Sequence, residues 1–183
     1  MSSHIHHQGR RPLASAELKT RSLEVLPLTA DGFSDYGDVI ETHNRPFTNI
    51  NEGLARRYFL LSTVEVVKDV PTISIVQTKG RNLNGPLTLM ERHPDSTQTF
   101  IPLGQIRFIV IVSKSDLAPD SLRAFITDGR QGINYRRNVW HHALVALSDG
   151  EFLVVDGGGP AILTEESPIA DWSMMLHLPT EQT

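Results

Sequence analysis

Two adjacent histidines interrupt the segment NYRRNVWHHALVAL, which covers residues 134–147. Near neutral pH an imidazole can act as a general base, as a proton donor or as a metal ligand. Neighbouring side chains of a β-strand point to opposite faces, so His141 and His142 cannot both serve one site. Strand alternation places His141 in phase with Tyr135 and Arg137. Both faces of this segment are apolar beyond His142, so alternation alone does not say which of the two histidines faces the interior.

A second segment, LTLMERHP, carries further ionisable side chains among apolar neighbours. Alternation along a strand puts Glu91 and His93 on the same face. Burying such groups is unfavourable unless they are paired or used, so two segments of this kind indicate a polar site in an apolar frame. The alternative for each histidine is a core residue held by hydrogen bonds, without a chemical role.

Short strands must position these residues. Runs rich in Val, Ile and Thr recur at roughly ten-residue spacing between Gly, Pro and Asp turns, which predicts an all-β sandwich or barrel. Helical periodicity is confined to the neighbourhood of Phe33 and to residues 115–122. Asp128-Gly129 is a hairpin-type turn signal, and further turns are expected at Asn84-Gly85-Pro86 and Asp149-Gly150.

Composition narrows the function classes. The 183 residues suit one domain with a proper core, and a net charge of −4 argues against a nucleic-acid partner. The chain has no cysteine, which excludes disulfides, cysteine-ligated zinc and thiol nucleophiles and fits the cytosol. No segment approaches the ~18 apolar residues of a membrane helix. We therefore expect neither a membrane span nor a nucleic-acid site.

The N-terminal residues read as a separate part of the chain. Residues 1–21 are rich in histidine and basic residues but lack the apolar region of a secretory signal. We predict a disordered tail or a cloning remnant over 1–21, followed by a single domain over 22–183. A metal site formed by His4, His6 and His7 is the alternative for this tail.

The spacing around Glu91 resembles the first metal-binding motif of the cupins, in which His-x-His is followed by Glu and then by Gly. Here Glu91-x-His93 is followed by Gln98 and Gly104, and His141 stands where the second cupin motif has its histidine. This position, together with the phase that His141 shares with Tyr135 and Arg137, makes us expect His141 to be the working residue and His142 to pack in the core or at an interface. Glu91 thus replaces a histidine, and Gln98 replaces the glutamate. Two imidazoles, a carboxylate and an amide can still hold a divalent ion, or they can form an acid/base set without a metal.

Four stretches together resemble the ureidoglycolate lyases of allantoin degradation, formerly called ureidoglycolate hydrolases: LPLTADGFSDYGDVIE, ERHPDSTQTFIP, LRAFITDGRQGINYRRNVWHH and FLVVDGGG. The resemblance covers Leu23 to Ile169. It implies a cupin-like jelly-roll β-barrel with one or two short helices, a cytoplasmic homodimer, and conversion of (S)-ureidoglycolate to glyoxylate and urea. The family is linked to nickel, which implies a possible divalent metal on His93, His141, Glu91 and Gln98.

The implied reaction assigns roles to these residues. It needs a general base at the substrate hydroxyl, a proton donor for the leaving nitrogen and a cation for the carboxylate. His141 or Glu91 would be the base and His93 the proton donor, directly or as ligands of a metal. Arg137 and Arg123 are candidates to bind the carboxylate, with structural ion pairs as the alternative. The ureido group could be bound by Tyr135, Asn138 and Gln98.

Two other functions remain open on the same barrel. A metal-dependent isomerase or dioxygenase would use the same ligands and lose activity with a chelator. A non-catalytic domain that binds a small molecule is also possible, because a fold does not determine a function. The charged candidate pocket disfavours this last reading.

Overall fold

The computed structural model describes residues 19–81, 88–158, 164–169 and 172–179. The predicted tail, the His4, His6 and His7 site, and the turn at Asn84-Gly85-Pro86 lie outside the described residues. The first strand already begins at Lys19, so part of the segment predicted to be a tail belongs to the folded domain.

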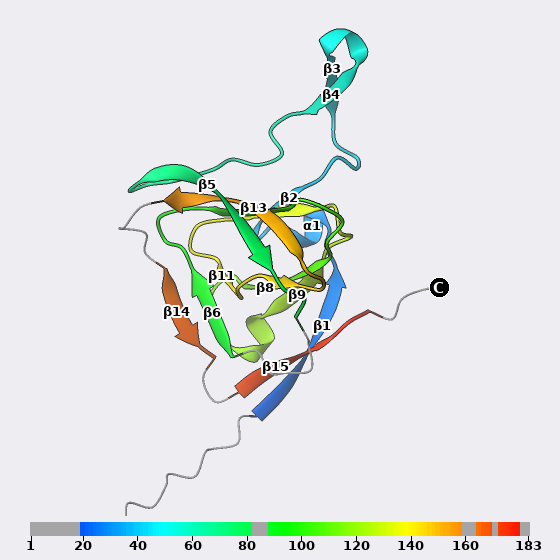
Figure 1. Cartoon of the computed structure of the whole chain (residues 1–183). Coiled ribbons are helices and arrows are strands. Elements are labelled where there is room, and N and C mark those ends of the chain that lie inside the picture. The colour runs from blue at the N-terminus through cyan, green and yellow to red at the C-terminus, as the bar shows by residue number, and fades with distance from the viewer. Residues whose placement is uncertain (1–18, 82–87, 159–163, 170–171, 180–183) are drawn as a thin grey trace, which may run out of the picture.

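Strands dominate the described part of the chain and form two main sheets (Figure 1). The eight-stranded sheet has the order β14–β6–β11–β8–β9–β1–β15, with β12 paired to β8. Its strands are β1 (Lys19–Pro27), β6 (Leu89–Arg92), β8 (Phe108–Ser113), β9 (Arg123–Ile126), β11 (Trp140–His141), β12 (Val145–Ala146), β14 (Glu165–Pro168) and β15 (Trp172–His177).

The five-stranded sheet has the order β2–β10–β7–β13–β5. Its strands are β2 (Gly37–Ile40), β5 (Val70–Thr78), β7 (Gln98–Pro102), β10 (Gly132–Tyr135) and β13 (Gly150–Gly158). A separate two-stranded hairpin consists of β3 (Phe47–Ile50) and β4 (Ala55–Tyr58).

The two sheets share one apolar core, to which β8 contributes Val110, β7 Phe100 and β13 Phe152. A second core covers the other face of the larger sheet and includes Ile111 and Met174. Every residue of β8 is therefore buried, which explains why FIVIVS is apolar without alternation. The curled sheets confirm the predicted all-β, cupin-like fold.

Both regions predicted to be helical contain a helical turn. α1 (Ala30–Phe33) begins after Thr29, whose hydroxyl accepts a hydrogen bond of 3.1 Å from the backbone N–H of Gly32, and it buries Phe33. A 3-10 turn covers Pro119–Ser121, within the second predicted region. A further 3-10 turn, Asn51–Gly53, was not predicted and joins β3 to β4.

The two Asp-Gly turns do not close hairpins. Asp128-Gly129 links β9 of the larger sheet to β10 of the smaller one, and Gly129 adopts a φ of 96° that favours glycine. Asp149-Gly150 links β12 to β13, again between the sheets. The hairpin expected at Asp128-Gly129 is therefore wrong, because a tight turn fixes the change of direction but not the pairing partner.

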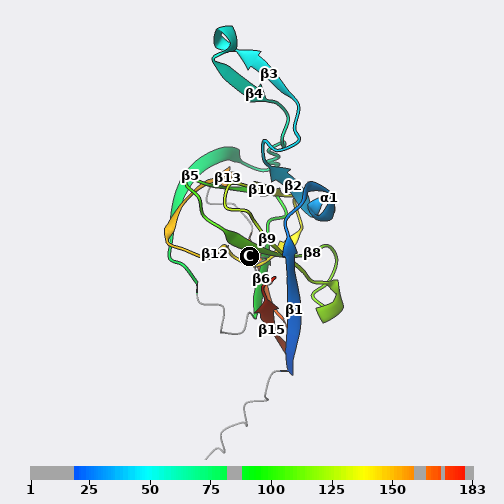
Figure 2. The ribbon, with the colours of Figure 1, turned by 90° about the vertical axis from the view of Figure 1, so that its right-hand side faces the viewer.

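The β3–β4 hairpin projects from the body, on the side where β2, β5 and β13 lie (Figures 1 and 2). The stretch LARRYFLLSTVEVV, residues 54–67, is rich in β-branched and aromatic residues, which favour strands. Only Ala55–Tyr58 forms a strand there, followed by an irregular connection with a single bridge from Val66 to Ser96. Among the described residues, no helix has the length and apolar character needed to cross a lipid bilayer.

Candidate active site

Four strands from both sheets bring the candidate residues together. In the larger sheet, Glu91 of β6 is the register partner of His141 of β11, which in turn lies opposite the core residue Val112. In the smaller sheet, Gln98 of β7 is the register partner of Tyr135 of β10. These side chains consequently point into the space between the sheets.

Glu91, His93 and His141 form a compact cluster. One potential ligand atom of each lies within 4.8 Å of those of the other two. His141 Nε2 is 3.6 Å from Glu91 Oε1, and the two imidazole rings are 5.2 Å apart between centroids. Tyr135 stacks on His141 with a centroid separation of 4.1 Å. The sequence predicted all four for one site, and the fold brings them together.

The orientation of His141 is fixed from both sides. Its Nδ1 is 2.9 Å from the carbonyl oxygen of Val139, which can only accept, so Nδ1 carries the proton and Nε2 presents a lone pair. Nε2 lies 3.2 Å from Gln98 Oε1. Burial lowers the pKa of His141 to about 3, so the ring is neutral near pH 7.

Asp156 determines which atom of Gln98 faces His141. Its carboxylate accepts hydrogen bonds of 3.4 Å from the Gln98 side-chain amide and from the Thr72 hydroxyl. The amide nitrogen of Gln98 is thus held by Asp156, and the amide oxygen is turned toward His141. Asp156 was not among the predicted site residues, although alternation along β13 places it in phase with the buried Phe152 and Val154.

Acceptor atoms of the cluster face one another, and no donor of the described residues lies between them. His141 Nε2 faces Gln98 Oε1 and Glu91 Oε1, and all three are acceptors when Glu91 is ionised. His93 Nε2 is buried and has no hydrogen-bond partner among the described residues. Converging nitrogen and oxygen acceptors fit a cation, and a neutral imidazole is the form that binds metals. These residues can therefore hold a metal ion.

Burial also changes the protonation of the neighbouring groups. It raises the pKa of Glu91, and the nearby charge of Glu166 raises it further. Burial lowers the pKa of His93, an effect that Asp156 partly opposes. The pKa of Tyr135 is raised by burial and then by the charge of Glu91, so its phenol keeps its proton. The cluster combines a carboxylate of increased basicity with neutral imidazoles.

The chain does not alternate continuously from Tyr135 to His141. β10 ends at Tyr135, and a turn over 136–139 with a φ of 64° at Asn138 precedes β11. The phase assigned to Arg137 is therefore wrong. Arg137 and Asn138 line a hollow together with Asn134. Asn134 and Tyr135 are neighbours on β10, so their side chains lie on opposite faces of the five-stranded sheet, and this hollow is on the face away from Tyr135.

The remaining predicted residues lie outside the cluster. The backbone N–H of Asn138 donates to the carbonyl of His93, so this residue supports the cluster through its main chain. Arg123 is exposed, and its guanidinium donates to the carbonyl oxygens of Asp120 and Leu122. His142 is buried, and its Nδ1 donates to the carbonyl of Ala143 at 2.7 Å.

A hollow adjoins the cluster at Glu91. Its lining consists of Arg81, Thr88, Leu89, Met90, Glu91, His142 and Ala143. Arg81 contributes a positively charged side chain to this lining. Its position is held by its backbone N–H, which donates to the carbonyl of Ala146. Arg81 could not be singled out from the sequence, because it follows β5 in the segment Lys79-Gly80-Arg81, which carries no recognisable motif.

Comparisons with known proteins agree with this geometry. The ureidoglycolate lyase family matches residues 20–173. The ureidoglycolate lyase of Escherichia coli strain SMS-3-5 is 52% identical over 143 residues, which cover 75% of this chain and 88% of that protein. The ureidoglycolate lyase of Escherichia coli strain K12 is 51% identical with the same coverage. The chain belongs to the ureidoglycolate lyase family.

Proposed function

We propose that the protein is a ureidoglycolate lyase that cleaves (S)-ureidoglycolate to glyoxylate and urea. The observation that carries this proposal is the cluster of Glu91, His93 and His141, enclosed between the sheets of a chain that belongs to this family. The reaction removes the proton of the substrate hydroxyl, forms the aldehyde C=O bond and breaks the C–N bond. The bonding pair leaves with the nitrogen, which takes up one proton, so no water is consumed.

Glu91 is placed to transfer that proton. It belongs both to the cluster and to the adjoining hollow, where substrate can enter. Its raised pKa makes it a stronger base than an ordinary carboxylate, and it also favours the protonated form that must exist during the step. We assign Glu91 the removal of the hydroxyl proton and its delivery to the departing nitrogen.

The histidines and the amide position the reacting groups. His141 Nε2 offers a lone pair inside the site, because its Nδ1–H is bound to Val139. His93 has an unpartnered buried Nε2, which can bind the substrate directly. Tyr135 holds the ring of His141 by stacking, and Asp156 orients Gln98.

The carboxylate of the substrate requires a cation, and Arg81 is the one that lines the hollow next to Glu91. We therefore assign the carboxylate to Arg81. This choice is supported by Arg123, which donates to the carbonyl oxygens of Asp120 and Leu122, and by Arg137, which lines a different hollow. A guanidinium can bind a carboxylate through two hydrogen bonds.

Arg81→Met keeps much of the apolar stem and removes the charge. We expect KM for ureidoglycolate to rise by about 10- to 100-fold, since charge-assisted hydrogen bonds contribute about 1.5–3 kcal/mol, with a smaller change in kcat. Arg123→Met, an exposed arginine outside the hollow, is the matched control and should leave KM within about twofold. Equal KM values for the two variants would refute the assignment of Arg81.

We further propose that a divalent metal, nickel by family resemblance, is held by His93, His141, Glu91 and Gln98. Their atoms form the acceptor set described above. A bound divalent ion would polarise the substrate hydroxyl and lower its pKa. Glu91 would offer Oε1, the oxygen that faces His141, and retain its second oxygen for the proton.

Metal binding can be measured without turnover. Calorimetric titration of chelator-stripped protein in which His4, His6 and His7 are replaced by alanine should show about one Ni²⁺ per chain. In this background His93→Ala should bind Ni²⁺ at least about tenfold more weakly, because one imidazole ligand is lost. His177→Ala, which removes an exposed histidine of β15, is the control in the same background and should leave the binding unchanged. Binding that persists unchanged in His93→Ala would exclude this site.

We also propose a cytoplasmic location and a homodimeric state. The location is supported by the absence of cysteine, since cytoplasmic proteins rarely depend on disulfides.

The experiment that tests the proposed function is the incubation of purified protein with (S)-ureidoglycolate, followed by measurement of glyoxylate. We expect release well above the uncatalysed rate, and no release above that rate would refute the proposal.

A further inference from the structure

The projecting hairpin and its flanks, residues 47–60, will be called the arm. Figures 1 and 2 show it extending away from both main sheets. Within the described residues β3 and β4 pair only with each other. An isolated two-stranded hairpin is marginally stable in water, so the arm needs a further surface to hold it.

The arm exposes large apolar side chains. Leu54 at its tip is 89% exposed and Leu60 at its base is 94% exposed, while Phe47, Ile50 and Phe59 are also exposed. Leu60 has a φ of 51°, a left-handed conformation that is unfavourable for leucine and persists only where surrounding contacts impose it. A side chain that is almost fully exposed makes few such contacts with the described residues of its own chain.

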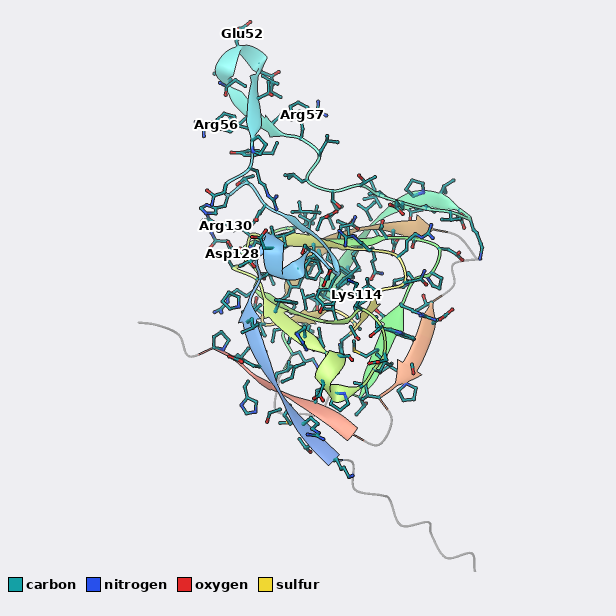
Figure 3. The ribbon with its side chains drawn as sticks, turned by 180° about the vertical axis from the view of Figure 1, so that it is seen from behind. Glu52, Arg56, Arg57, Lys114, Asp128 and Arg130 are labelled. Carbon is teal, nitrogen blue, oxygen red and sulfur yellow. The ribbon has the colours of Figure 1, made fainter. Side chains whose placement is uncertain are left out.

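The charged residues of the arm cover only part of this apolar surface. The guanidinium of Arg56 lies over the ring of Phe47 at 4.7 Å, and that of Arg57 lies over Phe59 at 4.5 Å. Figure 3 shows both arginines on the arm and Glu52 at its far end, all distant from the body. Leu54 and Leu60 remain unshielded.

The body carries a second uncovered apolar feature on the same side as the arm. β5 is an edge strand of the five-stranded sheet. Its register with β13 places Ile73 and Ile75 opposite Val155 and Leu153, on the outer face of that sheet. Ile73 is 73% exposed. A long apolar edge strand invites association unless something covers it.

We propose that the arm of each chain docks on the β5 edge of a second copy of this chain, and that its own β5 edge receives the arm of that copy. The arrangement is isologous, because the arm contacts the edge and the edge contacts the arm around a two-fold axis. The same arm–edge contact forms twice in the dimer, and together the two contacts cover the arm and the β5 edge of both chains. Stable interfaces typically bury ~1,600 Å² in total, and making the contact twice doubles the area that one arm covers. Because the contact is closed, association stops at the dimer.

Sedimentation velocity over a concentration series tests the proposal with two double variants. Leu54→Asp/Leu60→Asp alters only the arm, and Ile73→Asp/Ile75→Asp alters only the edge. We expect the unaltered protein to be a dimer and each double variant to have a dimer Kd raised by about tenfold or more. Leu178→Asp, which charges another exposed leucine of 46% exposure, is the control and should remain a dimer.

An equimolar mixture of the two double variants gives the sharper result. Each variant alone can form only dimers in which both arm–edge contacts are damaged. A heterodimer of the two contains one intact contact, between the unaltered arm of one chain and the unaltered edge of the other. We therefore expect mixing to restore association, detectable when one chain carries a mass tag.

A monomeric unaltered protein, open-ended oligomers, or dimers indifferent to both double variants would each overturn the proposal. So would double variants that dissociate but do not associate on mixing. Circular dichroism of each variant verifies folding, and a misfolded double variant is replaced by its single substitutions, Leu54→Asp and Ile73→Asp, in the same mixing test. The outcome is independent of the activity, so it separates this proposal from the proposed function.

Discussion

Replacing His141 with asparagine is expected to lower kcat by about 10²-fold or more, because misplacing the reacting groups that His141 positions has a cost of this order. The asparagine amide can still donate to the carbonyl of Val139, as Nδ1 of His141 does now. It cannot reach the position of Nε2, the atom that faces Gln98 and Glu91. The variant therefore removes the functional atom and keeps the buried hydrogen bond. Steady-state kinetics together with a thermal melt measures both effects.

His142→Asn is the matched variant for this experiment. Nδ1 of His142 donates to the carbonyl of Ala143, which the asparagine amide can again replace. We expect a lower Tm and a kcat within about tenfold of the unaltered protein. His142 lines the hollow but does not belong to the cluster of Glu91, His93 and His141, so its loss disturbs packing and substrate binding more than proton transfer. Equal loss of turnover in both folded variants would show that the two histidines do not differ in function.

Glu91→Gln is expected to lower kcat by about 10²- to 10⁴-fold, the contribution of a general acid/base group. Glutamine has nearly the same shape but cannot accept the hydroxyl proton. Because Glu91 is partly buried and its pKa is raised, removing its charge should not destabilise the fold. Kinetics and chemical denaturation of the same preparation should therefore show lost turnover with an unchanged or increased free energy of unfolding.

Glu166→Gln controls for the loss of a carboxylate in this region. Glu166 of β14 is the exposed register partner of Glu91 and acts on it only through its charge. Its replacement should change kcat by about threefold at most, since the proton-transferring group remains in place. A loss comparable to that of Glu91→Gln would mean that Glu91 is not the residue that moves the proton.

The sequence predicted which side chains meet inside the barrel better than it predicted which strands pair after each turn. Glu91, His93 and His141 could be grouped because polar residues on an alternating apolar face stand out, and the structure brings them together. The hairpin at Asp128-Gly129 could not be excluded, because the turn residues do not specify which sheet the next strand joins.

Arg137 illustrates the limit of strand alternation. Its phase with His141 holds only if the strand is continuous, and the turn before β11 breaks the strand. Asp156, by contrast, could have been predicted from its phase along β13. Arg81 could not, because a single arginine after a strand acquires its place beside Glu91 only when distant segments fold together.

The nitrogen product of the reaction tests the central claim most directly. Purified protein is incubated with (S)-ureidoglycolate, and urea, ammonia and glyoxylate are quantified in the same sample. Elimination at the C–N bond predicts one urea for each glyoxylate and no ammonia. Release of ammonia in place of urea would contradict the account, because it would require hydrolysis of the ureido group instead of its departure as urea.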